Sequence, residues 1–138
     1  MKFEDFIKNG QARKASIDTF LINSIHKTAL SDLKYLNTQQ ITSISCRKII
    51  SNYYDCLRAI LEAVALKEGY KIYQHEALTF FLKEKNEETQ SIKFDRFRKI
   101  RNKINYYGED LSVQEAKEIS EDIKLSIKYF IEKYFKES

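Results

Sequence analysis

The chain contains almost no residue that interrupts a helix. It has no proline and only three glycines, Gly10, Gly69 and Gly108, in 138 residues. Proline and glycine are the residues least favourable inside helices, so the sequence predicts a small number of long helices. The length also fits one domain with its own apolar core. We therefore expect a single helical domain over residues 1–138.

Apolar residues recur at spacings of three and four along most of the chain, which is typical of amphipathic helices. The spacing predicts helices over residues 12–36, 39–67, 74–85 and 92–106. A fifth helix is expected to open at Ser112, which forms a capping box with Glu115. We expect Asn37 to end the first helix and Thr38 to cap the second. Residues 86–91 contain no apolar side chain and predict a loop.

Long amphipathic helices with short connections pack antiparallel, because each apolar stripe must be covered by another. The predicted fold class is therefore all-α, an up-and-down four-helix bundle with an extra short helix at 74–85. The stripe that the first helix is expected to turn toward the core contains Ile17, Phe20, Leu21, Ser24, Ile25, Thr28 and Leu33.

Positive charge is concentrated in one segment, although the net charge of the whole chain is only +4. Residues 93–103 contain six basic side chains and one acid, Asp95. Aromatic and aliphatic residues interleave with them, so one face of the predicted helix is apolar and the rest is cationic. Two interpretations stay open, a site for a polyanion such as RNA and a solvated helix surface.

The sequence lacks the patterns of a metal site, a cofactor site or a membrane segment. His26 and His75 stand alone, and no spacing of the histidines or the two cysteines matches a metal site, so we expect no metal and no cofactor. His75 begins the predicted short helix, where a structural role is the simpler interpretation. No apolar run reaches about 18 residues, so we expect no membrane contact, and reduced cysteines predict a cytoplasmic protein.

Arg101 is the strongest candidate for a catalytic residue. Steps of 100° along the helix place it on the border of the apolar stripe. A guanidinium there binds phosphate in bidentate fashion and stabilises negative charge that develops at phosphorus. Asn102 offers an amide nearby and Tyr106 a hydroxyl. The phosphate-binding residues expected around them are Arg98, Lys99, Lys103 and Tyr107. The alternative is that Arg101 suits the helix C-terminus and that the tyrosines pack.

A second group of polar residues lies on the helix predicted over 39–67. Tyr54, Arg58 and Glu62 are spaced by four residues, which places them on one side of that helix. Such an arginine–glutamate pair is usually a surface ion pair. The alternative hypothesis is that Asp55, Arg58 and Glu62 support the site, with Asp55 or Glu62 orienting an arginine of another helix.

Several segments together resemble the HEPN superfamily, particularly its small stand-alone prokaryotic proteins. The matching segments are residues 53–63, 69–70, 75–78 and 98–108. The resemblance implies a helical bundle that forms a homodimer. Many members are metal-independent ribonucleases in which Arg-x(4–6)-His motifs of two subunits meet in a cleft. Some are toxins paired with a nucleotidyltransferase antitoxin.

In this resemblance, Arg101 matches the motif arginine and Asn102 the polar residue that often follows it. The positions allowed for the motif histidine hold Tyr106, Tyr107 and Gly108. With a pKa of about 10, a tyrosine stays protonated at pH 7 and is a poor general base. Three functions therefore stay open: a metal-independent endoribonuclease or toxin with a variant site, a non-catalytic module that binds RNA or a nucleotide, and a helical partner subunit of a nucleotidyltransferase.

Overall fold

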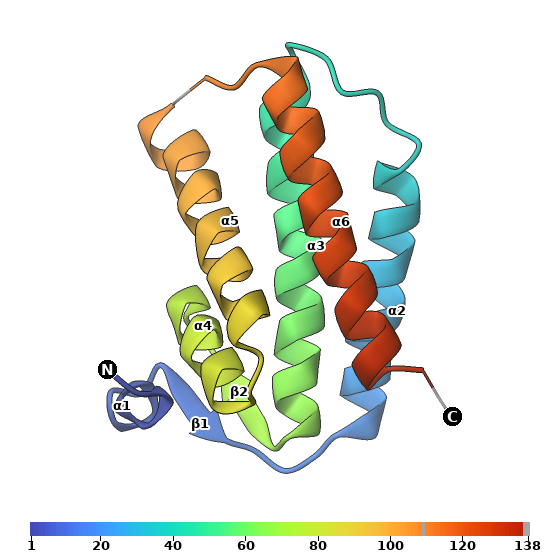
Figure 1. Cartoon of the computed structure of the whole chain (residues 1–138). Helices are drawn as coiled ribbons and strands as arrows, with labels where there is room; N and C mark the ends of the chain where they lie inside the picture. The colour runs from blue at the N-terminus through green and yellow to red at the C-terminus, as the bar shows by residue number, and fades with distance from the viewer. Residues whose placement is uncertain (109, 137–138) are drawn as a thin grey trace.

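Four long helices that run alternately up and down form the framework of the protein (Figure 1). The computed structural model describes residues 1–108 and 110–136, without the side chain of Tyr107. The long helices are α2 (Thr19–Leu36), α3 (Cys46–Lys67), α5 (Glu88–Tyr107) and α6 (Val113–Tyr134). The predicted all-α bundle is confirmed. Two short helices, α1 (Phe3–Lys8) and α4 (His75–Glu84), and a two-stranded sheet complete the described part of the fold.

Helix α3 is the centre of the bundle. It packs against α2, α5 and α6, and in Figure 1 it lies behind α6, between α5 and α2. Fourteen of its 22 residues are buried, including the large side chains of Tyr53, Tyr54 and Leu57. Since the other long helices pack around it, α3 fixes where their side chains meet.

Two helix ends follow the signals in the sequence. Ser112 Oγ accepts the Glu115 N–H at 3.1 Å, and Ser112 N–H donates to the Glu115 carboxylate at 3.3 Å. This pair of bonds is the predicted capping box at the start of α6. Gly108 ends α5 in the left-handed conformation, with a φ of 63° that favours glycine.

The predicted N-terminal boundary of the first long helix is wrong. Residues Ala12–Lys14 form strand β1, which pairs antiparallel with β2 (Tyr70–Ile72). Helix α2 begins only at Thr19, where the Asp18 carboxylate accepts the Leu21 N–H at 3.0 Å. A capping side chain and a distant strand partner therefore override the apolar spacing of residues 12–18.

The predicted inward stripe of α2 is wrong in part: its Ile25 and Leu33 are half-buried and pack against the core, but other members face outward. Phe20 is 86% exposed and Ile17, just before the helix, is 63% exposed. The residues that α2 buries are instead Ile22, Ala29 and Leu36. The apolar residues of this helix cover more than one face, and packing on α3 selects the face that contains Ala29.

Two further predicted boundaries differ from the structure. Helix α3 begins at Cys46 and not at residue 39. The Thr38 hydroxyl donates to the carbonyl of Tyr35 at 2.7 Å, so it closes the end of α2 and does not cap α3. Residues 86–91 are not a loop throughout, since α5 already begins at Glu88.

Glu87 is a buried carboxylate within this polar segment. Its side chain is only 4% exposed, and its carboxylate accepts hydrogen bonds from Tyr129 at 2.6 Å, Lys133 at 2.8 Å and Tyr134 at 2.8 Å. Burial raises the pKa of Glu87, but the bonds from these α6 residues outweigh burial and hold the pKa below its ordinary value. The carboxylate therefore joins the start of α5 to the end of α6.

Replacing Glu87 with glutamine is expected to lower the free energy of unfolding by about 1–3 kcal/mol at pH 7, because the buried acceptor loses its charge. The native pKa lies below that of the unfolded chain, so the stabilisation is complete above the unfolded pKa. It is lost as the pH falls through the native pKa. Urea unfolding of wild type and Glu87→Gln at pH 7 and pH 3 should show a difference that shrinks at low pH.

The matched control for this experiment is Glu88→Gln, because Glu88 is the exposed neighbour of Glu87. Its substitution should change the free energy of unfolding by less than about 0.5 kcal/mol. Equal losses in the two variants at pH 7 would show that the hydrogen bonds to Glu87 contribute nothing particular.

Candidate functional site

One side of α3 is left open by the other helices. The partly or fully exposed residues on this side are Lys48, Asn52, Asp55, Arg58 and Glu62. Their spacing of three and four residues makes them one continuous stripe. We call these five residues the polar stripe. Between residues 48 and 62 of the described α3, Ala59 is the only other residue that is not buried.

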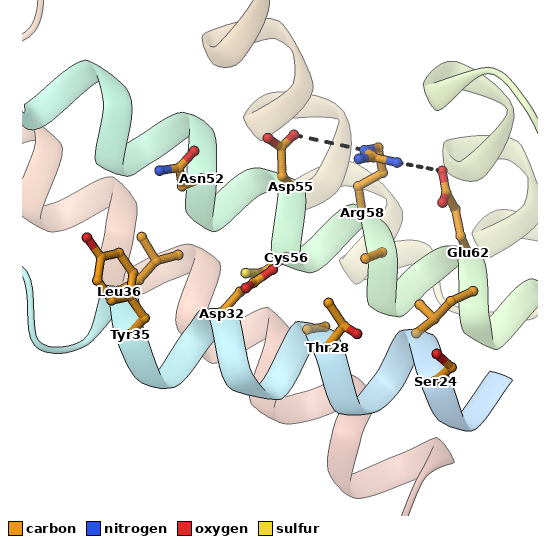
Figure 2. Close-up of a pocket in the computed structure, with 13 residues that line it drawn as sticks. Ser24, Thr28, Asp32, Tyr35, Leu36, Asn52, Asp55, Cys56, Arg58 and Glu62 are labelled. Atoms are coloured by element: carbon orange, nitrogen blue, oxygen red, sulfur yellow. Dashed lines mark hydrogen bonds and ion pairs between the residues drawn. The ribbon is translucent and has the colours of Figure 1, made fainter. Parts of the chain in front are cut away.

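Two hollows lie along this stripe. The larger, of about 610 Å³, lies between α2 and α3, and the smaller, of about 410 Å³, reaches Arg101 and Asn105 on α5. Both are lined by Asn52 and Asp55, so Asp55 stands where they adjoin. Figure 2 shows the larger hollow, with Asp55, Arg58 and Glu62 along α3 and Ser24, Thr28 and Asp32 along α2.

Arg101 extends from α5 to this stripe and has no hydrogen-bond acceptor there. Its side chain is 20% exposed, and its Nη2 atom is 3.7 Å from Asp55 Oδ1, which is longer than a hydrogen bond. Its Nε atom is buried without a hydrogen-bond partner among the described residues. A mostly buried guanidinium with free N–H donors is costly unless it meets an acceptor, so the geometry favours an anion at this position.

Arg58 and Arg98 lie near Arg101, and each has a closer carboxylate partner. Arg58 Nη1 is 2.8 Å from Glu62 Oε1, and its Nε atom is 4.0 Å from Asp55. Arg98 donates to Asp95 through Nη2 at 2.8 Å and through Nε at 3.2 Å. We call Arg58, Arg98 and Arg101 the arginine cluster. Asp55 contacts Arg101, an arginine of another helix, whereas Glu62 pairs within its own helix.

The cluster surrounds a buried tyrosine that contacts a histidine. Tyr54 is 0% exposed, stacks on Phe94 with centroids 5.5 Å apart, and lies 5.7 Å below the guanidinium of Arg101. The Tyr54 hydroxyl is 3.0 Å from His75 Nδ1. His75 is the first residue of α4, so three helices contribute to one polar site.

His75 belongs to the site, although this was not predicted from the sequence. It lies 21 positions after Tyr54, and no helix spacing links the two residues because they belong to different helices. Its place at the start of the short helix was predicted, but the identity of the side chain facing its imidazole was not. A pairing between α3 and α4 is information that only the packed structure contains.

The electrostatics of the site keep His75 neutral. Burial and the nearby charges of Arg58, Arg101 and Arg98 lower the pKa of His75 to about 4. Burial also raises the pKa of Tyr54, although the arginines oppose this effect, so the phenol stays protonated. For Asp95, burial raises the pKa, but hydrogen bonds from Arg98 and Lys99 outweigh it and the pKa is lowered. At pH 7 the site therefore holds a neutral imidazole beside three cations.

Other residues expected in the site lie outside the cluster. Tyr106 is 72% exposed and lines neither hollow, because α5 stays helical through its last turn. Lys99 is exposed and pairs with Asp95 at 3.0 Å, and Lys103 lines a separate hollow between α5 and α6. Asn102 is half-buried beside Arg101 in sequence. The side chain of Tyr107 lies outside the described part of the chain.

The described residues contain no group of three His, Cys, Asp or Glu side chains placed to hold a metal ion. Across the same part of the chain, no helix combines the length and the apolar character that crossing a membrane requires. Cys46 and Cys56 are both free and buried. The site therefore contains three guanidinium groups that can donate hydrogen bonds to an anion, and one imidazole. Three carboxylates, those of Asp55, Glu62 and Asp95, contact the guanidinium groups.

Comparison with known proteins adds no assignment: no protein-family model, no curated protein and no solved structure matches the chain.

The effect of the Arg101 charge on His75 makes a direct prediction. Replacing Arg101 with glutamine removes a positive charge that opposes protonation of the imidazole, so the pKa of His75 should rise from about 4 toward its ordinary value of 6.5. Titration of the histidine ring protons by NMR measures this change.

Arg96→Gln is the control for charge removal, because Arg96 lies on the same helix but is half-exposed and pairs with Asp122. This substitution should leave the pKa of His75 unchanged. An unchanged pKa in Arg101→Gln would place the guanidinium away from the imidazole and remove Arg101 from the site.

Proposed function

We propose that this protein is a HEPN-type RNA-directed protein that binds RNA phosphate at the arginine cluster. The observation that carries the proposal is Arg101, whose side chain is 20% exposed and whose buried Nε has no hydrogen-bond partner among the described residues. A phosphate oxygen would satisfy its N–H donors with charge-assisted hydrogen bonds. The family resemblance supports RNA as the source of that phosphate.

The surroundings of Arg101 favour an extended polyanion over a single small ion. The hollow that Arg101 lines is also lined by Arg47 and Lys48 of α3, and all three side chains are cationic. A row of cations along a groove suits successive phosphates of one strand, and binding of this kind weakens steeply as salt displaces it. Two buried free cysteines agree with a cytoplasmic protein.

Metal-independent RNA cleavage is the second candidate, and His75 is the observation that favours it. In this reaction an arginine stabilises the charge on phosphorus while an imidazole handles the protons during attack by the RNA 2′-hydroxyl. The motif histidine is absent from residues 106–108, but an imidazole from α4 lies beside the cluster. The third function, partnership with a nucleotidyltransferase, rests on the family resemblance alone.

Arg101→Ala should weaken the binding of a single-stranded RNA oligonucleotide at least tenfold, because a charged hydrogen-bonding group is worth about 1.5–3 kcal/mol. Tyr106→Phe should bind within about twofold of wild type, since the hydroxyl belongs to a side chain that is 72% exposed. Fluorescence polarisation at several salt concentrations measures both effects. A parallel incubation of labelled RNA with EDTA tests cleavage.

Arg96→Ala is the matched control for a lost surface cation and should cause a smaller loss that depends on salt. Equal losses of RNA affinity in Arg96→Ala and Arg101→Ala would show that RNA is attracted by the positive charge of the helix in general and not by a specific site at Arg101. Cleavage in EDTA that disappears in Arg101→Ala would establish the ribonuclease function, and binding without cleavage would establish the non-catalytic one.

We also propose a homodimer in which a second copy covers the larger hollow, between α2 and α3. Phe20 is 86% exposed and Tyr35 62%, and Tyr35 lines the larger hollow. Phe20 precedes Ser24 and Thr28 by one and two helical turns, so it lies on the α2 face that lines the same hollow. Large exposed apolar side chains beside an open groove are typical of an interface.

Light scattering of the purified protein should therefore give the mass of a dimer, and Phe20→Ser should shift it toward a monomer. Leu125→Ser is the control, because Leu125 is 61% exposed on α6, which lines neither hollow on the open side of α3. A wild-type monomer at high protein concentration would remove the dimer from the proposal and leave RNA binding by one chain.

A further inference from the structure

His75 has one ring nitrogen bound within the protein and one left for a ligand. Nδ1 is 3.0 Å from the hydroxyl of Tyr54. The hydroxyl is buried, and the imidazole is its only hydrogen-bond partner among the described residues, so the phenol donates and Nδ1 accepts. In a neutral imidazole the proton then sits on Nε2. Because the His75 side chain is only half-buried, Nε2 remains for solvent or a ligand.

The charges that act on this imidazole come from the two helices packed beside it. Helix α3 contributes Arg58, and α5 contributes Arg98 and Arg101. The carboxylates near these arginines are already engaged with them, as described above. Consequently the imidazole lies in a positive field with no acidic partner of its own among the described residues, which disfavours its protonation while the site is empty of anions.

An anion at the arginine cluster would reverse this balance. Its negative charge offsets the three guanidinium groups, and an oxygen near Nε2 would accept a hydrogen bond from the imidazole. Both effects favour the imidazolium over the neutral ring. When Nδ1 gains the second proton, it donates to the Tyr54 hydroxyl oxygen. The buried phenol O–H then loses its acceptor, and the bound anion has to outweigh this cost.

We propose that an RNA phosphate bound at the arginine cluster contacts His75 and that the imidazole takes up a proton as the phosphate binds. This inference rests on the proposed function, because it takes the ligand to be RNA. In this proposal the proton is carried by His75 of α4 and not by Tyr106, the residue that the sequence suggested for the site. It also makes RNA binding depend on pH through one identified side chain.

The test is an NMR titration of the histidine ring protons from pH 7.5 to 3.5, with and without a 2′-O-methyl RNA oligonucleotide that cannot be cleaved by 2′-hydroxyl attack. The chain has only two histidines, and His26→Gln assigns their signals. RNA is expected to raise the pKa of His75 from about 4 to near 6. By linkage, the affinity for RNA then rises about tenfold between pH 7 and pH 5.

Two variants separate a proton-carrying role from a merely structural one. His75→Gln should bind RNA more weakly than wild type, because its contact with the phosphate is altered, and it should lose the extra pH dependence. His26→Gln should keep that dependence, because His26 stacks on Phe135 with centroids 4.3 Å apart and lies near Lys67, away from the cluster. The wild-type titration stands alone if His75→Gln does not fold.

The outcomes distinguish this inference from the function on which it rests. If RNA binds in an Arg101-dependent manner and the pKa of His75 stays near 4, the inference is overturned and the proposed function stands. If the two histidine variants show equal pH dependence, the inference is likewise overturned. If the oligonucleotide does not bind at any pH, the proposed function and the inference both fail.

Discussion

The packing of α3 is the constraint on which the rest of the structure depends. A helix with 14 of 22 residues buried must fill most of its circumference with side chains that pack well. Only a narrow stripe remains for charged groups, and residues from α2, α4 and α5 meet at that stripe because those helices pack on the sides of α3. Packing of the core therefore brings the polar residues of the site together, and no specialised loop is needed.

Tyr54 connects the core to the polar site. Its ring stacks on Phe94 in the interior, while its hydroxyl contacts His75 and one ring face lies below Arg101. A buried aromatic ring in close packing has little freedom to move, so it holds the imidazole and the guanidinium at fixed positions. Burial and the clustered cations also keep the imidazole of His75 neutral. This electrostatic state requires residues from α3, α4 and α5 together.

Much of the fold could be predicted because its signals are local. The capping box at Ser112 and the antiparallel packing of the long helices were both predicted. Several of the failures come from competition with distant partners. Residues 12–14 pair with a strand far along the chain, Phe20 turns outward because α3 accepts another face of α2, and Glu87 is buried because three α6 side chains bond it.

The sequence by itself determined that Arg101 lies at the edge of an apolar stripe and that Asp55, Arg58 and Glu62 lie near one another on one helix, because helical periodicity depends only on spacing along the chain. Only the tertiary structure decided that Asp55 contacts Arg101, that His75 joins the cluster, and that Tyr106 does not. These outcomes depend on how helices rotate and pack against each other, and that rotation is set by the whole core at once.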